Sequence, residues 1–134
     1  MLRTRKFLVF VLALLMLIPA ACSQAADPVV NISESDAGKT IELKKGDTLV
    51  VTLQGNITTG YNWEMEAATA PAFLQQVGEP EVTPESGLVG AGGKIALKFS
   101  AVQTGQATMK LVYHRAWEKG VAPAKTYEVK LVVK

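Results

Sequence analysis

The side chains that most often carry out chemistry are scarce in this sequence of 134 residues. It contains one cysteine, Cys22, and one histidine, His114. These two residues cannot form a His-pair or cysteine-rich zinc site, nor an internal disulfide. Nucleophilic catalysis by His114 would need a serine and a carboxylate arranged around it, and no serine here lies in a nucleophile-elbow sequence. We therefore expect no enzyme activity, no bound metal and no cofactor.

Three other segments have compositions suited to binding. Residues 55–60 read Gly-Asn-Ile-Thr-Thr-Gly, and the paired threonines would present small, stiff hydroxyl side chains on a narrow turn. Residues 84–93 include four glycines, so their bare backbone could pair with an extended partner. Residues 114–120 place Arg115 close to Trp117, and these residue types are frequent interface hot spots. The simpler interpretations are an ordinary turn, a flexible linker, and a Trp117 folded back with Arg115 stacked over it.

The rest of the chain predicts the rigid support that such loops need. Apolar and polar residues alternate in 48–54, 61–65, 94–101, 109–114 and 127–133, as in half-buried strands. Shorter candidates are 29–32, 40–43 and 73–77, the last running towards Val82. Residues 44–47, Lys-Lys-Gly-Asp, predict a tight hairpin. With no long helical period, the chain is expected to be all-β: an immunoglobulin-like antiparallel β-sandwich of about seven to eight strands.

The N-terminus has the pattern of an export signal. Three basic residues precede the apolar run 7–18, which is too short to cross a bilayer as a helix. Small residues then lead to Cys22, which resembles a bacterial lipobox in which that cysteine is lipidated. Cleavage after Ser23-Gln24-Ala25 is the second possibility. We expect a signal peptide over 1–21, a tether over 22–28, a domain over 29–134, and a periplasmic or cell-envelope location, with membrane attachment only through Cys22.

Charge argues against a nucleic-acid partner. The net charge of +2 includes three basic residues of the leader, and without residues 1–21 the chain has 11 basic and 12 acidic residues. Phosphate binding needs a basic surface, which this balanced composition does not supply.

The order of the three loop segments resembles the signature of the chagasin-like inhibitors of papain-family cysteine proteases. The likeness runs from about residue 40 to the end of the chain. Its most specific parts are Thr-Thr-Gly-Tyr and Arg-x-Trp. This chain has Ile57 and Ala116 where the family commonly has proline, which implies less rigid loops and a lower affinity.

The resemblance implies a reversible, non-covalent inhibitor whose three loops fill the active-site cleft of a papain-like protease. Thr58 and Thr59 would reach the catalytic cysteine and histidine, with the glycine segment on one side and Arg115 and Trp117 on the other. A monomer is the simplest expectation, and the alternative is a cell-envelope or carbohydrate-binding sandwich module. The protease-binding residues implied are Asn56, Thr58, Thr59, Gly60, Tyr61, Gly90, Gly92, Gly93, Arg115 and Trp117.

Overall fold

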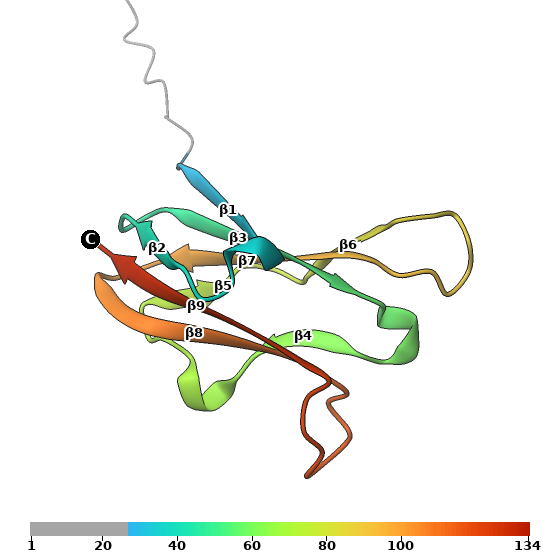
Figure 1. Cartoon of the computed structure of the whole chain (residues 1–134). Coiled ribbons are helices and arrows are strands. Elements are labelled where there is room, and N and C mark those ends of the chain that lie inside the picture. The colour runs from blue at the N-terminus through green and yellow to red at the C-terminus, as the bar shows by residue number, and fades with distance from the viewer. Residues whose placement is uncertain (1–26) are drawn as a thin grey trace, which may run out of the picture.

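A computed structural model describes residues 27–134, which form two β-sheets packed face to face (Figure 1). The expected signal peptide, Cys22 and most of the tether lie outside the described residues. Residues 27–134 include three single-turn 3-10 helices, η1 (Glu34–Asp36), η2 (Ile57–Thr59) and η3 (Ala67–Thr69). The strands are β1 (Val29–Ser33), β2 (Thr40–Leu43), β3 (Thr48–Gly55), β4 (Asn62–Met65), β5 (Leu74–Gln76), β6 (Glu81–Pro84), β7 (Gly93–Ala101), β8 (Gly105–His114) and β9 (Lys125–Val133).

The expected sandwich is confirmed, with two differences in detail. One sheet has the order β1-β3-β7-β5, with β6 also paired to β7, and the other has the order β2-β9-β8-β4. The described chain thus has nine strands, and both sheets are mixed, because β1 pairs with β3 and β2 pairs with β9 in parallel. The chain passes from β1 through η1 to β2, which belongs to the other sheet. Both β1 and β2 lie at the edge of their sheet, and each pairs with a strand that comes later in the chain.

The hairpin expected at residues 44–47 is wrong. A tight turn does form, with the Asp47 carboxylate accepting a hydrogen bond from the Lys44 backbone at 2.7 Å and with Gly46 at a φ of 96°. However, β2 and β3 belong to different sheets, so the turn crosses the sandwich. Turn chemistry predicts the local reversal, but the partner of each strand depends on contacts distant in sequence.

The alternating residues form the core as expected. The inward-facing side chains of β3 and of its neighbour β7 are almost completely inaccessible, and the same holds for the central residues of β8 and β9. Trp63 on β4 is also buried, and its indole N–H donates to the Gln54 backbone oxygen at 3.0 Å. The largest fully buried side chains are Phe99, Leu43, Leu49, Leu53, Ile95, Leu97, Met109, Leu111 and Leu131.

Strand register brings three connections to one end of the sandwich. In one sheet the end of β3 pairs with the start of β7, through Gly55 and Gly93. In the other sheet the start of β4 pairs with the end of β8, through Asn62 and His114. The connections β3–β4, β6–β7 and β8–β9 therefore all leave from the same end. In Figure 1 the first two lie on the right and the β8–β9 connection extends towards the bottom.

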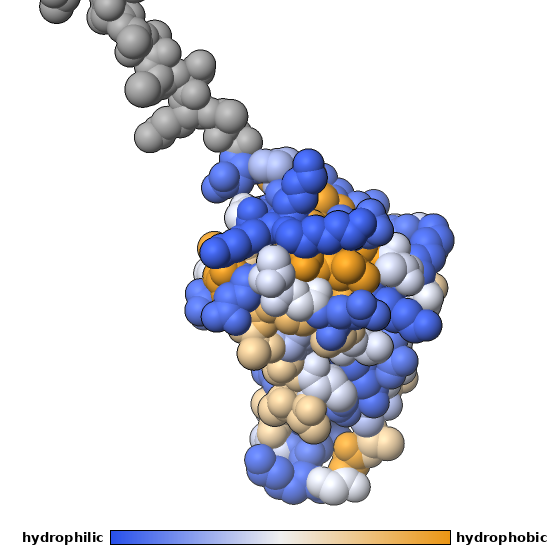
Figure 2. Space-filling view, turned by 90° about the vertical axis from the view of Figure 1, so that its left-hand side faces the viewer, coloured by the Kyte–Doolittle hydropathy of each residue, from blue (hydrophilic) through white to orange (hydrophobic). Residues whose placement is uncertain are grey.

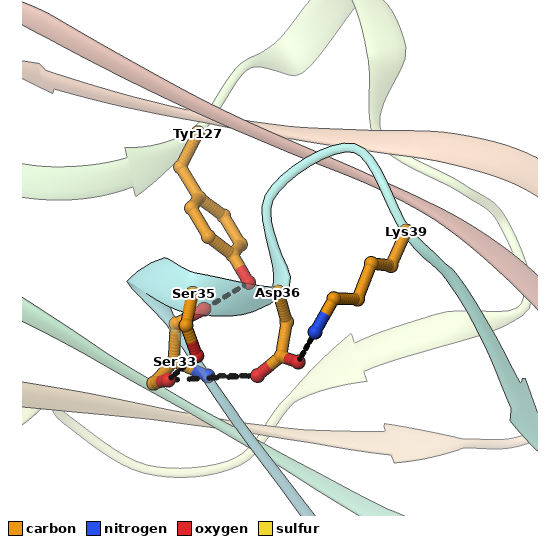
Figure 3. A network of polar contacts seen from close by, with 5 residues as sticks. All are labelled: Ser33, Ser35, Asp36, Lys39 and Tyr127. Atoms are coloured by element: carbon orange, nitrogen blue, oxygen red, sulfur yellow. Dashed lines mark hydrogen bonds and ion pairs between the residues drawn. The ribbon is translucent and has the colours of Figure 1, made fainter.

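A polar network ties the two sheets together near η1 (Figure 3). Tyr127 of β9 donates a hydrogen bond across the sandwich to the Ser33 backbone oxygen at 2.8 Å. Burial, with smaller effects from the nearby carboxylates, raises the pKa of Tyr127 to about 12. Hydrogen bonds from the Ser33 backbone N–H and from Lys39 lower the pKa of the Asp36 carboxyl. The network fastens β1 and η1 to the opposite sheet.

The end of the sandwich opposite the three connections has a different surface. Seen face-on in Figure 2, its upper part has hydrophilic residues around a hydrophobic area, and residues of intermediate hydropathy make up much of the part below. Lys44 and Lys45, in the turn at this end, are exposed. Within residues 27–134, no helix has the length and hydropathy needed to span a bilayer.

Candidate functional site

The site is built from the three connections at one end of the sandwich. We call them the threonine loop (residues 56–61), the glycine loop (residues 85–92) and the tryptophan loop (residues 115–124). They are far apart in sequence but are joined to each other by direct contacts. The threonine loop lies between the other two, because it alone has contacts with both in the interactions that follow.

Asn56 joins the threonine loop to the glycine loop. Its side-chain amide donates a hydrogen bond to the Gly90 backbone oxygen at 2.9 Å. Its side-chain oxygen caps η2 by accepting from the Thr58 backbone N–H at 3.1 Å. Its backbone N–H donates to the buried Tyr113 hydroxyl at 2.7 Å. Asn56 therefore fixes the base of the threonine loop to both the glycine loop and β8.

The tryptophan loop contacts the other side of the threonine loop. Arg115 donates a hydrogen bond from Nε to the Thr59 backbone oxygen at 3.0 Å and pairs with Glu118 at 2.9 Å. The hydrogen bond to Glu118 raises the pKa of Arg115, which keeps the guanidinium charged. The indole of Trp117 lies directly against Gly60, which has a φ of 83°, so a side chain at position 60 would collide with it.

An aromatic stack supports the loops from below. Tyr113 lies between Tyr61 and Trp63, with ring centroids 5.2 and 5.1 Å away. The Arg115 guanidinium covers the Tyr61 ring at 4.5 Å from its centroid. Such contacts hold the rings rigid and contribute about 0.5–1.5 kcal/mol per aromatic pair. Because the Tyr61 ring is stacked and covered, it offers little free face to a sugar, which weighs against the carbohydrate-binding alternative.

The structure brings the expected site residues together but gives several of them internal roles. Arg115 stacks on Tyr61 and binds the threonine loop, instead of stacking over Trp117 or projecting freely towards a partner. Gly93 is buried at the start of β7, where a side chain would collide with the backbone of Thr83. Gly90 has a φ of 80° and open space around it, so its backbone lies exposed in the glycine loop.

The outer surface of the loops combines the threonine hydroxyls at its centre with exposed apolar side chains on all three loops. Thr58 and Thr59 are exposed on the middle loop, and Trp117 is 66% exposed beside them. A groove of about 300 Å³ runs between the threonine and glycine loops. Residues 27–134 contain no grouping of His, Cys, Asp or Glu side chains that would suit a metal ion. The exposed large apolar residues of the three loops are Ile57, Leu88, Val89, Trp117 and Val121.

Comparison with known proteins assigns the chain to a family. Residues 42–131 match the family model described as the chagasin family peptidase inhibitor I42. The chain belongs to the chagasin family. Members of this family are inhibitors of peptidases and not enzymes, so the expectation that the chain has no catalytic activity is confirmed.

Similar proteins support the assignment over most of the chain. Amoebiasin-1 from Entamoeba histolytica is 31% identical over 104 residues, covering 78% of this chain and 99% of that protein. Chagasin from Trypanosoma cruzi is 27% identical over 90 residues, covering 65% of this chain and 82% of that protein. The crystal structure of EhICP2, a cysteine protease inhibitor from Entamoeba histolytica, has a TM-score of 0.66 at 24% identity, covering 82% and 99% of the two chains.

Sequence reasoning missed two residues on which the chagasin-type loops of this chain depend. The alternation over residues 109–114 predicts Tyr113 only as an inward-facing residue of its strand, but its hydroxyl also accepts a hydrogen bond from the Asn56 backbone N–H. A buried tyrosine hydroxyl needs a hydrogen-bond partner, so a tyrosine at the loop end of an otherwise aliphatic strand face was the available signal. Glu118 lies three residues after Arg115 and accepts a hydrogen bond from its guanidinium at 2.9 Å. The spacing of these two residues can be read from the sequence, but spacing alone does not show that their side chains pair.

Proposed function

We propose that this chain is a reversible inhibitor of papain-like cysteine proteases, and that its three loops enter the active-site cleft together. The observation that carries the proposal is the direct connection of the loops, with the threonine pair exposed in the middle. A cleft-filling wedge needs a narrow centre and two wider flanks, which is the arrangement of the threonine, glycine and tryptophan loops.

The loops are held in place before any partner arrives. Asn56, Arg115 and Trp117 each join the threonine loop to a neighbouring loop, as described above. A loop that is already ordered loses less conformational entropy on binding, which favours affinity. These contacts offset the missing rigidity at Ile57 and Ala116, where the family commonly has proline.

The mode of inhibition follows from what the loops offer the enzyme. Thr58 and Thr59 would lie near the catalytic cysteine and histidine without placing a scissile carbonyl for attack. The exposed backbone around Gly90 would lie along one wall of the cleft, and Trp117 would pack against the other. Gly92 is half-buried, and its carbonyl oxygen already accepts a hydrogen bond from the Glu85 backbone N–H at 3.1 Å. Blockade would be steric and polar, with no covalent bond between inhibitor and enzyme.

Inhibition kinetics test the proposal directly. Residues 27–134 contain both sheets and the whole described core, so this segment is the unit to assay. We expect reversible, sub-micromolar inhibition of papain and of a lysosomal cathepsin, with the inhibitor recovered uncleaved. No inhibition of either enzyme at micromolar concentration, or steady cleavage in the threonine loop, would refute the proposal.

We propose further that the chain is exported from a bacterial cell and attached to a membrane through a lipid on Cys22. The support is in the sequence alone: the basic start, the short apolar run and the small residues before the single cysteine. Labelling of the full chain with a radioactive fatty acid, compared with a Cys22→Ser variant, tests this. Equal labelling of both, or a mature N-terminus beginning after Ala25, would contradict it.

A further inference from the structure

The hydrogen-bond directions within the threonine loop are fixed by groups that can act in only one way. The Thr58 backbone N–H can only donate, so the Asn56 side-chain atom 3.1 Å from it must be the oxygen. The Gly90 backbone oxygen can only accept, so the Asn56 atom 2.9 Å from it must be the nitrogen. The orientation of the Asn56 amide therefore follows from its backbone partners.

Both threonine hydroxyls consequently use their hydrogens inside the loop. The Thr58 hydroxyl lies 2.6 Å from the Asn56 side-chain oxygen, and the Thr59 hydroxyl lies 2.6 Å from the Asn56 backbone oxygen. Each of these Asn56 oxygens is an acceptor, so each hydroxyl must be the donor. The lone pairs of both hydroxyl oxygens remain to accept from a partner.

The backbone donors of the same residues are also satisfied within the loop. The Thr58 N–H donates to the Asn56 side chain, and the Thr59 N–H points to the Asn56 backbone oxygen at 3.4 Å. The Gly60 N–H donates to the Ile57 backbone oxygen at 3.0 Å. All three N–H groups and both hydroxyls of residues 58–60 thus have internal partners. Residues 58–60 therefore present hydrogen-bond acceptors to a partner, because their own donors are already used.

We propose that the threonine loop recognises hydrogen-bond donors, and that it binds a cysteine protease more tightly when the catalytic histidine is protonated. This inference rests on the proposed function. A thiolate needs donors, which residues 58–60 do not supply, whereas an imidazolium has N–H groups to donate. A charge-assisted hydrogen bond from the histidine is roughly twice as strong as one between neutral groups.

The inhibitor's own charged groups near the site must be separated from this effect. His114 is 2.8 Å from Glu64, Arg115 pairs with Glu118, and Lys125 lies over the Tyr113 ring. On the side of the glycine loop, Glu85 accepts from Gln54. These groups belong to the inhibitor and are the same whichever form of the protease is bound, so comparing two forms of one protease removes their contribution.

Calorimetry with two forms of papain tests the inference. In active papain the thiolate keeps the neighbouring histidine protonated across pH 5–8. In a papain variant with the catalytic cysteine replaced by alanine, that histidine loses the thiolate and titrates nearer its ordinary value. We expect the affinity of residues 27–134 for active papain to be nearly constant over this range. For the alanine variant we expect it to fall about tenfold from pH 5 to pH 8, with proton uptake on binding at neutral pH.

Variants of the inhibitor assign the effect to the threonines. A Thr58→Val, Thr59→Val double variant keeps the shape of both side chains and should reduce the tenfold pH dependence to less than threefold. The Thr58→Ser, Thr59→Ser double variant keeps both hydroxyls and should retain it. Thr108→Val, on the exposed surface of β8, is the control for loss of a threonine hydroxyl elsewhere.

The outcomes separate this inference from the proposed function. If the unmodified inhibitor fails to bind active papain at any pH, the proposed function is wrong. If it binds active papain but its affinity for the alanine variant is constant or rises from pH 5 to pH 8, only the donor recognition is wrong. An unchanged pH dependence in the double valine variant would also overturn the inference.

Discussion

Replacing Trp117 with alanine should weaken protease binding while leaving the fold intact. Burying a tryptophan removes about 150–250 Å² from water. Since the side chain is 66% exposed in the free protein, roughly 100–165 Å² remains for a partner to cover. At about 25 cal/mol per Å², this area corresponds to about 2.5–4 kcal/mol.

Part of that free energy is offset when the complex forms. Fixing one side chain at an interface costs about 0.5–1.5 kcal/mol. The net loss for Trp117→Ala is therefore about 2 kcal/mol, which corresponds to about a thirtyfold higher inhibition constant. The stability of the free protein should change little, because the indole lies outside the core and its close contact in the free protein is with Gly60.

Two measurements on the same samples check this prediction. Steady-state inhibition of papain gives the affinity, and thermal unfolding followed by circular dichroism gives the stability. Val121→Ala is the matched control, because Val121 is an exposed apolar residue of the same loop and should cost less than threefold in affinity. A less than threefold effect of Trp117→Ala would refute its role in binding. A parallel fall in affinity and Tm would show that Trp117 acts through the fold.

Three further changes have defined expectations. Gly60→Ala places a side chain against the Trp117 indole at a φ of 83°, which costs about 1–2 kcal/mol in strain. Papain affinity should therefore fall about tenfold. The control Gly87→Ala, at a position with open space around it, should leave papain affinity unchanged. Arg115→Lys keeps the charge but loses the Nε hydrogen bond to Thr59, so surface plasmon resonance should show slower association and up to tenfold weaker binding. Tyr127→Phe should lower the free energy of unfolding by about 1 kcal/mol in urea at pH 7. Because the folded pKa of Tyr127 is about 12 against an ordinary value of 10.0, the unfolded chain loses this proton first, so the wild type should lose stability as pH rises above 10 and the variant should lose less.

Loop rigidity in this chain arises from contacts between loops. Ile57 and Ala116 lack the ring that would restrict the backbone locally, and the sequence therefore implied looser loops. In the structure, the hydrogen bond from Asn56 to Gly90 and the hydrogen bond from Arg115 to Thr59 join the threonine and tryptophan loops to neighbouring loops, which restrains both. A residue type indicates local stiffness, but restraint by a partner distant in sequence appears only when both positions are known in space.

The strands and the composition of the loops could be predicted from sequence because both depend on near neighbours. Alternation of apolar and polar residues has a period of two, which places Leu49, Val51 and Leu53 on one face regardless of the rest of the chain. The threonine pair and the Arg-x-Trp segment are likewise visible as local patterns, and their order was enough to suggest the family.

Tertiary structure alone decided how these parts act together. Asn56 meets Gly90 across 34 positions, and Arg115 meets Thr59 across 56, so no local pattern records these contacts. The same holds for the sheet that β2 joins and for the parallel edge strands. Pairing of strands far apart in the chain sets which loop ends meet, and the free energy of that pairing belongs to the whole sandwich and not to any one segment.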